Sequence, residues 1–514
     1  MSHKRQFNIG ALTRRELLRR AGPAALLGTA APLGLNLAAL GTASAQTATD
    51  YKALVCVFLY GGNDSYNTVL ATDAASWKAY TTLRNQAPDS LALMSPGVAP
   101  NSGASAYSPA RLGGVLPIAP AKSQGHTYAL HPLLSSLVPL FNTQKRLALV
   151  ANVGPLVQPT TKAQYASSAH AKPPKLFSHN DQQSVWQSLA TEGARTGWGG
   201  RMADLLLAGN GNSMFTAVSA TGTSVWLAGS NARQYQVTPT GAIRPGGTSL
   251  FGSSVALPYL KTVMTSATSN HVMARDLAAL GSRAFAAESS LSAALPSAGT
   301  APWGTAAGNY DQNTDPLLKF TSPGSGTAMI NPLATQLQMV ARMIQARSSL
   351  GVKRQVFFVA LNDFDTHDNQ NRRHSEALAQ LNHGLAYFDK VINSLGLGAN
   401  VTTFTASDFG RTLTSNGDGT DHGWGGHHFI MGGAVKGGDL YGTFPTLGPK
   451  NANNNDFDSS ADLLANGALL PTSSVDQYAA TLGRWLGLSD AALLDVLPNL
   501  KNFDASVRNL GFLG

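Results

Sequence analysis

The sequence predicts an α/β fold with a central, mostly parallel sheet and helices on both of its faces. Short runs that are apolar at every position, such as 53–59 and 147–153, are typical of strands covered on both sides. These runs alternate with longer segments of helical pattern, as in parallel sheets whose strands are joined by helices. A chain of 514 residues is long enough for one large domain of this kind.

The elements follow one another along most of the chain. Strands are expected at 53–59, 147–153, 355–361, 401–405 and 429–431. Helices are expected at 131–141, from about 181, and at 201–207, 332–347, 374–395 and 476–486. The segment 209–330 is rich in Ser, Thr, Gly and Ala, so we interpret it as an insertion or cap with long loops. One long helical stretch is expected within it at 253–291, and partial disorder is left open.

Residues 1–45 have the organisation of an export signal. Thr13-Arg14-Arg15-Glu16-Leu17-Leu18-Arg19 has the pattern of a twin-arginine core, and a weakly apolar stretch with two prolines follows at 21–41. The small residues Ala43-Ser44-Ala45 then suit a cleavage site before Gln46. We expect a mature chain of one domain, 46–514, that is periplasmic or secreted. Its partner in export would be the twin-arginine translocase, and it would meet the membrane only then. A retained anchor is less favoured, since a spanning helix needs about 20 strongly apolar residues.

Charge and cysteine content exclude some classes of function. The formal net charge is +9, but the six basic residues and one acidic residue of 1–45 account for five of these charges. The remaining +4 is spread without a basic run, so no nucleic-acid partner is expected. The single cysteine, Cys56, lies in the first apolar run, and we expect a buried core thiol that forms no internal disulfide.

Acidic residues follow three of the expected strands at the point where each strand ends. Loops at the carboxyl ends of parallel strands converge, and carboxylates that meet there repel one another unless a cation neutralises them. Nearby histidines would add nitrogen donors, and this mixture favours a divalent metal ion. Each residue alone has a plainer interpretation as a helix cap or a hydrogen-bonded loop corner. The acidic residues are Asp64, Asp363, Asp365 and Asp408, and the histidines are His367 and His422.

The order of these motifs resembles a widespread family of twin-arginine-exported proteins of unassigned function. That family looks like a branch of the alkaline phosphatase and sulfatase superfamily, and the resemblance covers nearly the whole mature chain. It implies a three-layer, alkaline-phosphatase-like sandwich. The residues that carry the resemblance are Gly61-Gly62-Asn63-Asp64-Ser65-Tyr66-Asn67, Ser178-His179, Asp365-Thr366-His367, Ser407-Asp408-Phe409-Gly410-Arg411-Thr412 and the segment from Asp421-His422 to Gly433.

The resemblance also implies two metal positions. One would be built from Asp363, His367 and His422, which is the composition of a catalytic zinc site with an open coordination place. The other would use Asp64 and Asp408.

Phe409 departs from the superfamily pattern, which has a histidine at this place. A phenyl ring cannot bind a metal, so the second position would be rich in oxygen. Such a position suits Mg²⁺, Ca²⁺ or Mn²⁺, or it stays empty.

The remaining site residues are assigned from their places in these motifs. Ser178 opens a helical pattern and is the preferred nucleophile, with an ordinary helix N-cap as the alternative. Ser65 is a second candidate, and a metal-bound hydroxide is a third. Arg411 and Asn67 are expected to contact an anionic substrate or to support the ligands. For Arg411, a salt bridge to a neighbouring carboxylate is an equal alternative.

Together these features indicate an exported metal-dependent hydrolase of phosphate or sulfate esters, with a small-molecule or polymeric substrate. A catalytically decayed, metal-stabilised binding or surface scaffold is the main alternative. A carbohydrate-binding or cell-surface module built on the Ser/Thr/Gly-rich segment is a third, weaker possibility.

Overall fold

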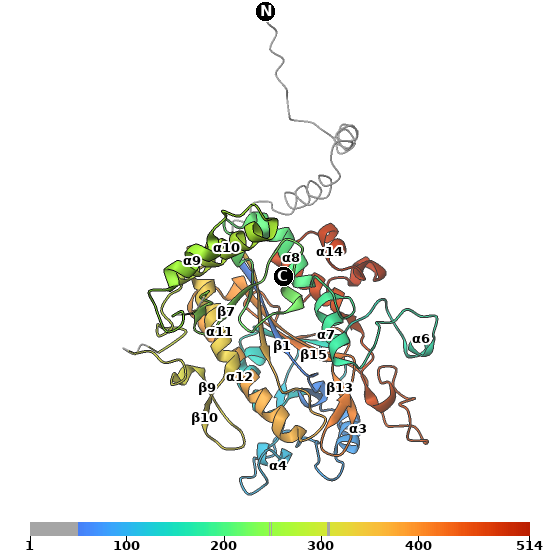
Figure 1. Ribbon diagram of the computed structural model, residues 1–514. Helices are drawn as coiled ribbons and strands as arrows, with labels where there is room; N and C mark the ends of the chain where they lie inside the picture. Colours follow the sequence, from blue (N-terminus) through green and yellow to red (C-terminus); the bar gives the residue numbers. More distant parts are fainter. Residues whose placement is uncertain (1–49, 246, 248, 306–308) are drawn as a thin grey trace, which may run out of the picture.

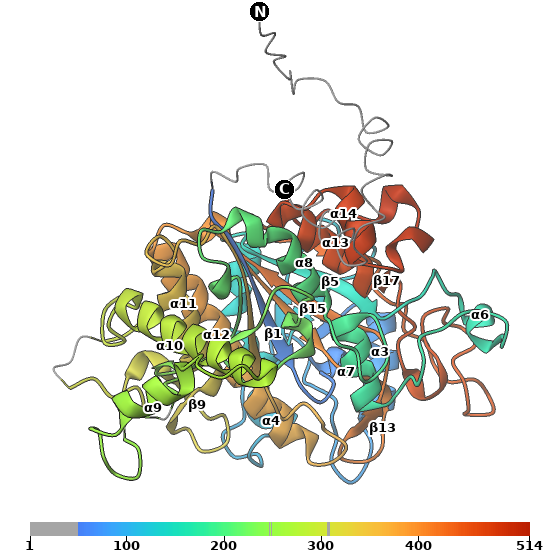
Figure 2. The same cartoon turned by 45° about the horizontal axis from the view of Figure 1, so that its top comes forward.

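A large mixed sheet runs through the centre of the molecule, and helices cover both of its faces (Figures 1 and 2). The computed structural model describes residues 50–514 except 246, 248 and 306–308. The predicted twin-arginine core and cleavage site therefore lie outside the described residues.

The sheet has ten strands in the order β16-β5-β15-β12-β1-β11-β6-β7-β8, with β17 beside β5. In the centre, β1 pairs in parallel with both β11 and β12, whereas β15 is antiparallel to β12 and β5. The predicted mostly parallel sheet is thus confirmed. The strands are β1 (Lys52–Leu59), β5 (Leu147–Gly154), β6 (Ala217–Ser219), β7 (Tyr235–Thr238), β8 (Gly241–Ala242), β11 (Arg354–Leu361), β12 (Val401–Ser407), β15 (Gly426–Met431), β16 (Leu440–Tyr441) and β17 (Ser473–Ser474).

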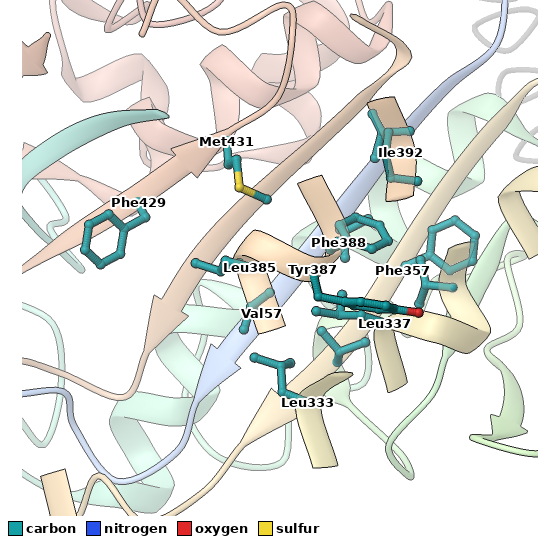
Figure 3. Close-up of a cluster of buried hydrophobic side chains, with 14 of the residues drawn as sticks. Val57, Leu333, Leu337, Phe357, Leu385, Tyr387, Phe388, Ile392, Phe429 and Met431 are labelled. Carbon is teal, nitrogen blue, oxygen red and sulfur yellow. The ribbon is translucent and has the colours of Figure 1, made fainter. Parts of the chain in front are cut away.

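Two hydrophobic cores lie on opposite faces of this sheet because successive side chains of a strand point to opposite sides. Val55 and Val57 of β1 belong to the core under α11 (Pro332–Gln345) and α12 (Gln370–Ser394), and Figure 3 shows the packing around Val57. Their neighbour Cys56 belongs to the other core and is 1% exposed, which confirms the predicted buried thiol. Burial on both faces explains why β1 is apolar at nearly every position.

The second core packs under helices from both halves of the chain. They are α7 (His179–Ser188), α8 (Trp198–Leu206), α13 (Val475–Leu486) and α14 (Asp490–Val496). The other helices are α3 (Ala74–Arg84), α4 (Pro109–Leu112), α5 (Leu137–Asn142), α6 (Lys162–Ala166), α9 (Leu257–Thr265) and α10 (Val272–Ala294). No helix in the described part of the chain is long and apolar enough to cross a membrane.

Three small sheets complete the described structure. Two of them are pairs and one has three strands. Their strands are β2 (Val69–Ala71), β3 (Leu116–Ile118) and β4 (Tyr128–Leu130), then β9 (Lys319–Thr321) with β10 (Ala328–Ile330), and β13 (Arg411–Ser415) with β14 (Thr420–His422).

The segment 209–330, which the sequence predicts to be an insertion or cap, also contributes strands to the main sheet. Its strands β6, β7 and β8 extend the main sheet at one edge. The single helix expected at 253–291 is two helices, α9 and α10, separated by 266–271. Ser, Thr and Asn dominate this break, and their side chains compete with helical backbone hydrogen bonds.

Candidate metal centre

The polar loops converge at one edge of the sheet because of the strand directions. Strands β1, β11 and β12 are parallel, so the loops that follow them leave the sheet at the same edge. Strand β5 ends at that edge too and leads to α7 through the segment 155–178, which contains α6. The antiparallel strand β15 begins there, just after β14.

Four side chains from these loops form a group that could hold a metal ion: His179, Asp365, His367 and His422. One ligand atom from each lies within 4.8 Å of the others. The Nε2 atoms of His179, His367 and His422 lie 3.4, 3.5 and 4.0 Å from Oδ1 of Asp365. Three imidazoles therefore turn the same ring atom toward one carboxylate oxygen.

The opposite nitrogen of each ring faces an oxygen acceptor. These pairs are His179 Nδ1 with Asp408 Oδ2 at 2.8 Å, His422 Nδ1 with the carbonyl oxygen of Phe177 at 2.6 Å, and His367 Nδ1 with Asp421 Oδ1 at 3.4 Å. A carbonyl oxygen only accepts, so His422 carries its hydrogen on Nδ1 and turns an Nε2 lone pair inward. Outer acceptors of this kind orient histidine ligands in metal sites.

The charges in the group favour cation binding. Burial and the positive groups around His422 lower its pKa to about 4, so the ring is neutral at pH 7. Burial acts to raise the pKa of Asp365, but Arg411 and the histidines outweigh it and hold this pKa below the usual value. The pKa of His179 is raised, chiefly by its hydrogen bond to Asp408. A metal ion at the centre would take the place of the His179 proton.

The donor set fits zinc. Nε2 of His179 is buried, points into the group and has no hydrogen-bond partner. Three imidazole nitrogens and one carboxylate oxygen are ligands that Zn²⁺ accepts. The Nε2 atoms of His367 and His422 are 2.7 Å apart, and small ring rotations would bring them to the roughly 3.3 Å separation of two zinc ligands. The side chains of Asp365 and His367 are each 45% exposed, so the group is open to solvent on one side.

Phe409 forms an apolar wall behind two of the imidazoles. Its ring centre lies 4.8 Å from that of His179 and 4.6 Å from that of His422. The ring also fills the space beside Gly62, where a Cβ atom would lie 2.3 Å from it. Phe409 thus offers no ligand atom and packs against these two rings.

Asp64 lies outside the group and has a different partner. It is fully buried, and its two carboxylate oxygens accept hydrogen bonds from Arg84 at 2.5 and 2.8 Å. Burial acts to raise its pKa, but Arg84 outweighs burial and lowers it. The position expected from Asp64 and Asp408 is not assembled, because Arg84 neutralises one carboxylate and His179 binds the other.

Asp363 is exposed and lies outside the group, and Asp365 takes the expected place beside His367. The backbone at Asp363 has a φ of 74°, and the next residue, Phe364, is fully buried. This turn directs Asp363 away from the centre. An available signal was spacing: residues two apart in an extended segment, such as Asp365 and His367, share one side. His179 is a member that the sequence reasoning misses, and its place beside Ser178 at the start of a helical pattern is the signal for it.

The hydroxyl groups of both candidate serines are hydrogen-bonded to residues outside the four-residue group. Ser178 is the N-cap residue of α7, and its hydroxyl donates to Asp181 Oδ2 at 2.9 Å. Ser65 is buried, and its hydroxyl oxygen accepts the backbone N–H of His427 at 2.8 Å.

Arg411 and Asn67 are both buried and hydrogen-bonded within the protein. Arg411 forms an ion pair with Asp365, which is the salt-bridge alternative considered for it. Its other hydrogen bonds go to carbonyl oxygens, those of Gly61, Gly62, Phe364 and Thr420. Asn67 donates to the carbonyl of Leu91 and accepts from Tyr80. Because both side chains are enclosed, they support the loops and do not face solvent.

Comparisons with known proteins give distant structural likenesses. None of the curated proteins compared with the chain matches it significantly. A crystal structure of Ps i-CgsB in complex with k-i-k-neocarrahexaose aligns with 9% identity and a TM-score of 0.32, covering 89% of this chain and 77% of that one. A structure from work on the metabolism of multiple glycosaminoglycans by Bacteroides thetaiotaomicron aligns with 9% identity and a TM-score of 0.30, covering 86% and 74%. A family model matches residues 51–497, nearly all of the described chain, and the protein therefore belongs to the family described as "Protein of unknown function (DUF1501)".

Proposed function

We propose that the protein is an exported, metal-dependent hydrolase of phosphate or sulfate esters. A single divalent ion, zinc by its donor set, would be held by His179, Asp365, His367 and His422. The observation that carries this proposal is the convergence of three imidazole Nε2 atoms on one carboxylate oxygen. The ester class rests on the resemblance of the motifs to the alkaline phosphatase and sulfatase superfamily, since a fold alone does not determine an activity.

The residues around the group have distinct tasks in this proposal. A Zn²⁺ ion held there would lend Lewis acidity to an ester oxygen, or lower the pKa of a water molecule, only at a fifth coordination place, since the four side chains fill a tetrahedral shell. Asp408 holds the ring of His179 in place, and Arg411 holds the carboxylate of Asp365. The exposed side, formed by Asp365 and His367, is where a substrate would approach. Because the hydroxyls of Ser178 and Ser65 are hydrogen-bonded elsewhere, water would be the attacking molecule in this proposal.

Metal analysis of single variants tests the site. The purified protein is expected to hold about one zinc ion per chain, and Asp365→Ala or His422→Ala to lose it. Asp363→Ala is the matched carboxylate control and is expected to keep the metal, as is His170→Ala, which alters a histidine bonded to Thr160 and Gln158. A metal-free wild type contradicts the proposal, and so does metal loss in Asp363→Ala but not in Asp365→Ala.

Turnover is tested with aryl phosphate, aryl phosphodiester and aryl sulfate substrates. The zinc-loaded protein is expected to hydrolyse at least one class, and His422→Ala to lose this activity with the fold retained. A loaded protein that hydrolyses none of them refutes the ester hydrolase.

Export through the twin-arginine pathway is part of the same proposal. Replacing Arg14 and Arg15 with Lys is expected to hold the protein inside the cell. Cell fractionation measures this, and normal export of the Lys-Lys variant refutes the route.

A metal-stabilised scaffold is the second candidate, because both serines that might act as nucleophiles are engaged elsewhere. Removal of the metal distinguishes the two functions. A scaffold loses several degrees of melting temperature and shows no turnover in any state, whereas the hydrolase loses turnover.

A further inference from the structure

Helix α10 carries an apolar seam with the spacing of a coiled coil. Its residues lie four, three, four, three and four positions apart, which is the a/d pattern of a heptad repeat. The seam consists of Met273, Leu277, Leu280, Ala284, Ala287 and Leu291.

The C-terminal part of this seam is buried, and its N-terminal part is exposed to solvent. Ala287 and Leu291 are 2% and 0% exposed and belong to the core under α11 and α12. Met273, Leu277 and Leu280 are 70%, 63% and 50% exposed. Helix α10 thus carries the same stripe beyond the edge of the core, where no described residue covers it.

Helix α9 does not cover the exposed half. It meets α10 at Gly281, where a Cβ atom would lie 2.4 Å from the carbonyl oxygen of Met264. Gly281 is outside the seam, so α9 packs on a different side of α10. Both views place the two helices together at the outer edge of the molecule (Figures 1 and 2).

The apolar surface is large enough for a stable interface. Helix α9 and the segment before it add more exposed apolar side chains, namely Phe251, Val255, Tyr259 and Val263. With roughly 150–250 Å² for each aromatic side chain and somewhat less for each Met, Leu or Val, the exposed parts of the seam and of these neighbours together come to on the order of 1,000 Å², of which the seam supplies the smaller share. A standard interface takes about 800 Å² from each partner, whereas the largest apolar patch of a typical monomer is about 300–600 Å².

We propose that the exposed half of the α10 seam binds the same seam of a second copy of this chain, in an antiparallel pair about a two-fold axis. In this register Leu277 packs against Leu280 of the partner subunit, and Met273 packs against Ala284 of the partner subunit. Each contact occurs twice, as a two-fold interface requires.

Charge selects the antiparallel arrangement. Asp276 and Arg283 are exposed and both occupy the g position that flanks the seam. In the antiparallel register Asp276 lies beside Arg283 of the partner subunit, and symmetry repeats this opposite-charge pair. A parallel pair would place Asp276 beside Gly281 of the partner subunit and leave both charges without a partner.

Charge reversal tests the arrangement in the purified full chain by sedimentation velocity over a dilution series. The wild type is expected to dimerise. Asp276→Arg and Arg283→Asp each place like charges together at two sites, and each is expected to raise the dimer dissociation constant about tenfold. The double variant exchanges the charges and is expected to restore the wild-type value. An equimolar mixture of the two single variants is expected to form the mixed dimer.

Leu277→Ser tests the seam itself and is expected to weaken the dimer at least about a hundredfold, because it removes two leucine contacts. Leu494→Ser, at an apolar side chain of α14 that is 37% exposed, is the control and is expected to change nothing. A monomeric wild type overturns the proposal. Binding of this monomer to vesicles of phosphatidylethanolamine and phosphatidylglycerol would indicate that a lipid surface covers the seam instead. A dimer that withstands Leu277→Ser also overturns it, as does a double variant no tighter than the single ones.

Discussion

His179 is held from both sides of its ring. Nδ1 donates to Asp408, whose carboxylate is buried and also accepts from Gln183 and from the backbone N–H of Gly61. Nε2 faces Asp365 and has no hydrogen-bond partner. Burial raises the pKa of Asp408, so the negative charge of this carboxylate depends on its three donors. The carboxylate in turn sets which nitrogen of His179 is available to a metal.

We therefore expect Asp408→Asn to weaken metal binding by about 10–100-fold, since the amide can accept a hydrogen bond but lacks the charge. Competition with a chromophoric chelator measures the dissociation constant. Asp204→Asn is the control, because Asp204 also accepts several backbone hydrogen bonds but lies at another place on the molecule. Equal affinities of Asp408→Asn and the wild type would contradict this role.

At the residue scale, the sequence predicts that histidines and carboxylates meet at one edge of the sheet, but it does not predict all of the residues that do. The sequence pointed to His367 because it follows an expected strand and to His422 because it lies in a histidine-rich segment just before one, and the structure brings these two together. The choice between Asp363 and Asp365 depends on one left-handed backbone conformation at Asp363, which no pattern of residue types encodes. The partnership of Asp64 with Arg84 depends on where α3 packs, and this is a tertiary contact.

At the scale of elements, the buried ion pair of Asp64 and Arg84 fastens α3 beneath the site. The side chain of Arg84 also donates to the carbonyl oxygens of Leu413 and Thr412 in β13. Gln370, at the start of α12, donates to Asp64 and accepts from Thr366 and Thr420, which lie close in sequence to His367 and His422. One network therefore links α3, the start of α12, the loop after β1 and the segments that carry two of the histidines.

Arg84→Met is expected to destabilise the protein by about 3–5 kcal/mol, because it leaves the Asp64 carboxylate buried without a counter-charge. Asp64→Asn combined with Arg84→Met is expected to cost less than the single change. Urea unfolding measures both free energies. Arg484→Met removes an exposed ion pair with Asp490 and is expected to cost at most about 1 kcal/mol. Equal costs for the single and double variants would refute the explanation.

Helix α13 carries a carboxyl group that makes stability depend on pH. Burial raises the pKa of Asp476 to about 7, although Asn499 donates to the carboxylate. The folded protein then keeps this proton to a higher pH than the unfolded chain does. The free energy of unfolding is expected to fall between about pH 4 and pH 7, by on the order of a few kcal/mol, and to level off above. Asp476→Asn is expected to remove this part of the slope in urea unfolding from pH 4.5 to 8, and a variant with an unchanged slope would disprove the assignment.

Element prediction succeeded where burial leaves a pattern in the sequence. The runs at 53–59 and 355–361 are β1 and β11 to within one residue, because strands buried on both faces are apolar throughout. The edge strands β6 to β8 have two to four residues each and are too short to show a period. The break between α9 and α10 was hidden by apolar residues that recur at helical spacing on both sides of it.

At the scale of the whole molecule, the central strands join the two cores, and β1 lies in the middle of them. Strand β1 lies between β11 and β12 and sends alternate side chains into the core on either face. A local opening cannot expose the centre of this strand without separating its neighbours, so solvent access there requires global unfolding.

Cys56 makes this property measurable. Its thiol is 1% exposed in β1, and burial raises its pKa well above the usual value. An aromatic disulfide reagent is expected to leave the thiol unreacted in the native protein, with labelling slower than in guanidinium by at least about 10⁴-fold. The sequence holds one cysteine, so the signal has a single source. Fast labelling under native conditions would show that β1 opens locally.

The candidate metal centre is assembled from distant parts of the chain. The contact between His179 and Asp408 spans 229 residues, and the hydrogen bond from Arg411 to the carbonyl of Gly61 spans 350. Such contacts form only after most of the chain has found its place, because closing long loops is entropically costly. A truncated or half-folded chain would present its histidines apart and bind metal weakly. A bound ion would thus mark a completely folded chain. An export route that carries only folded proteins could make use of this mark.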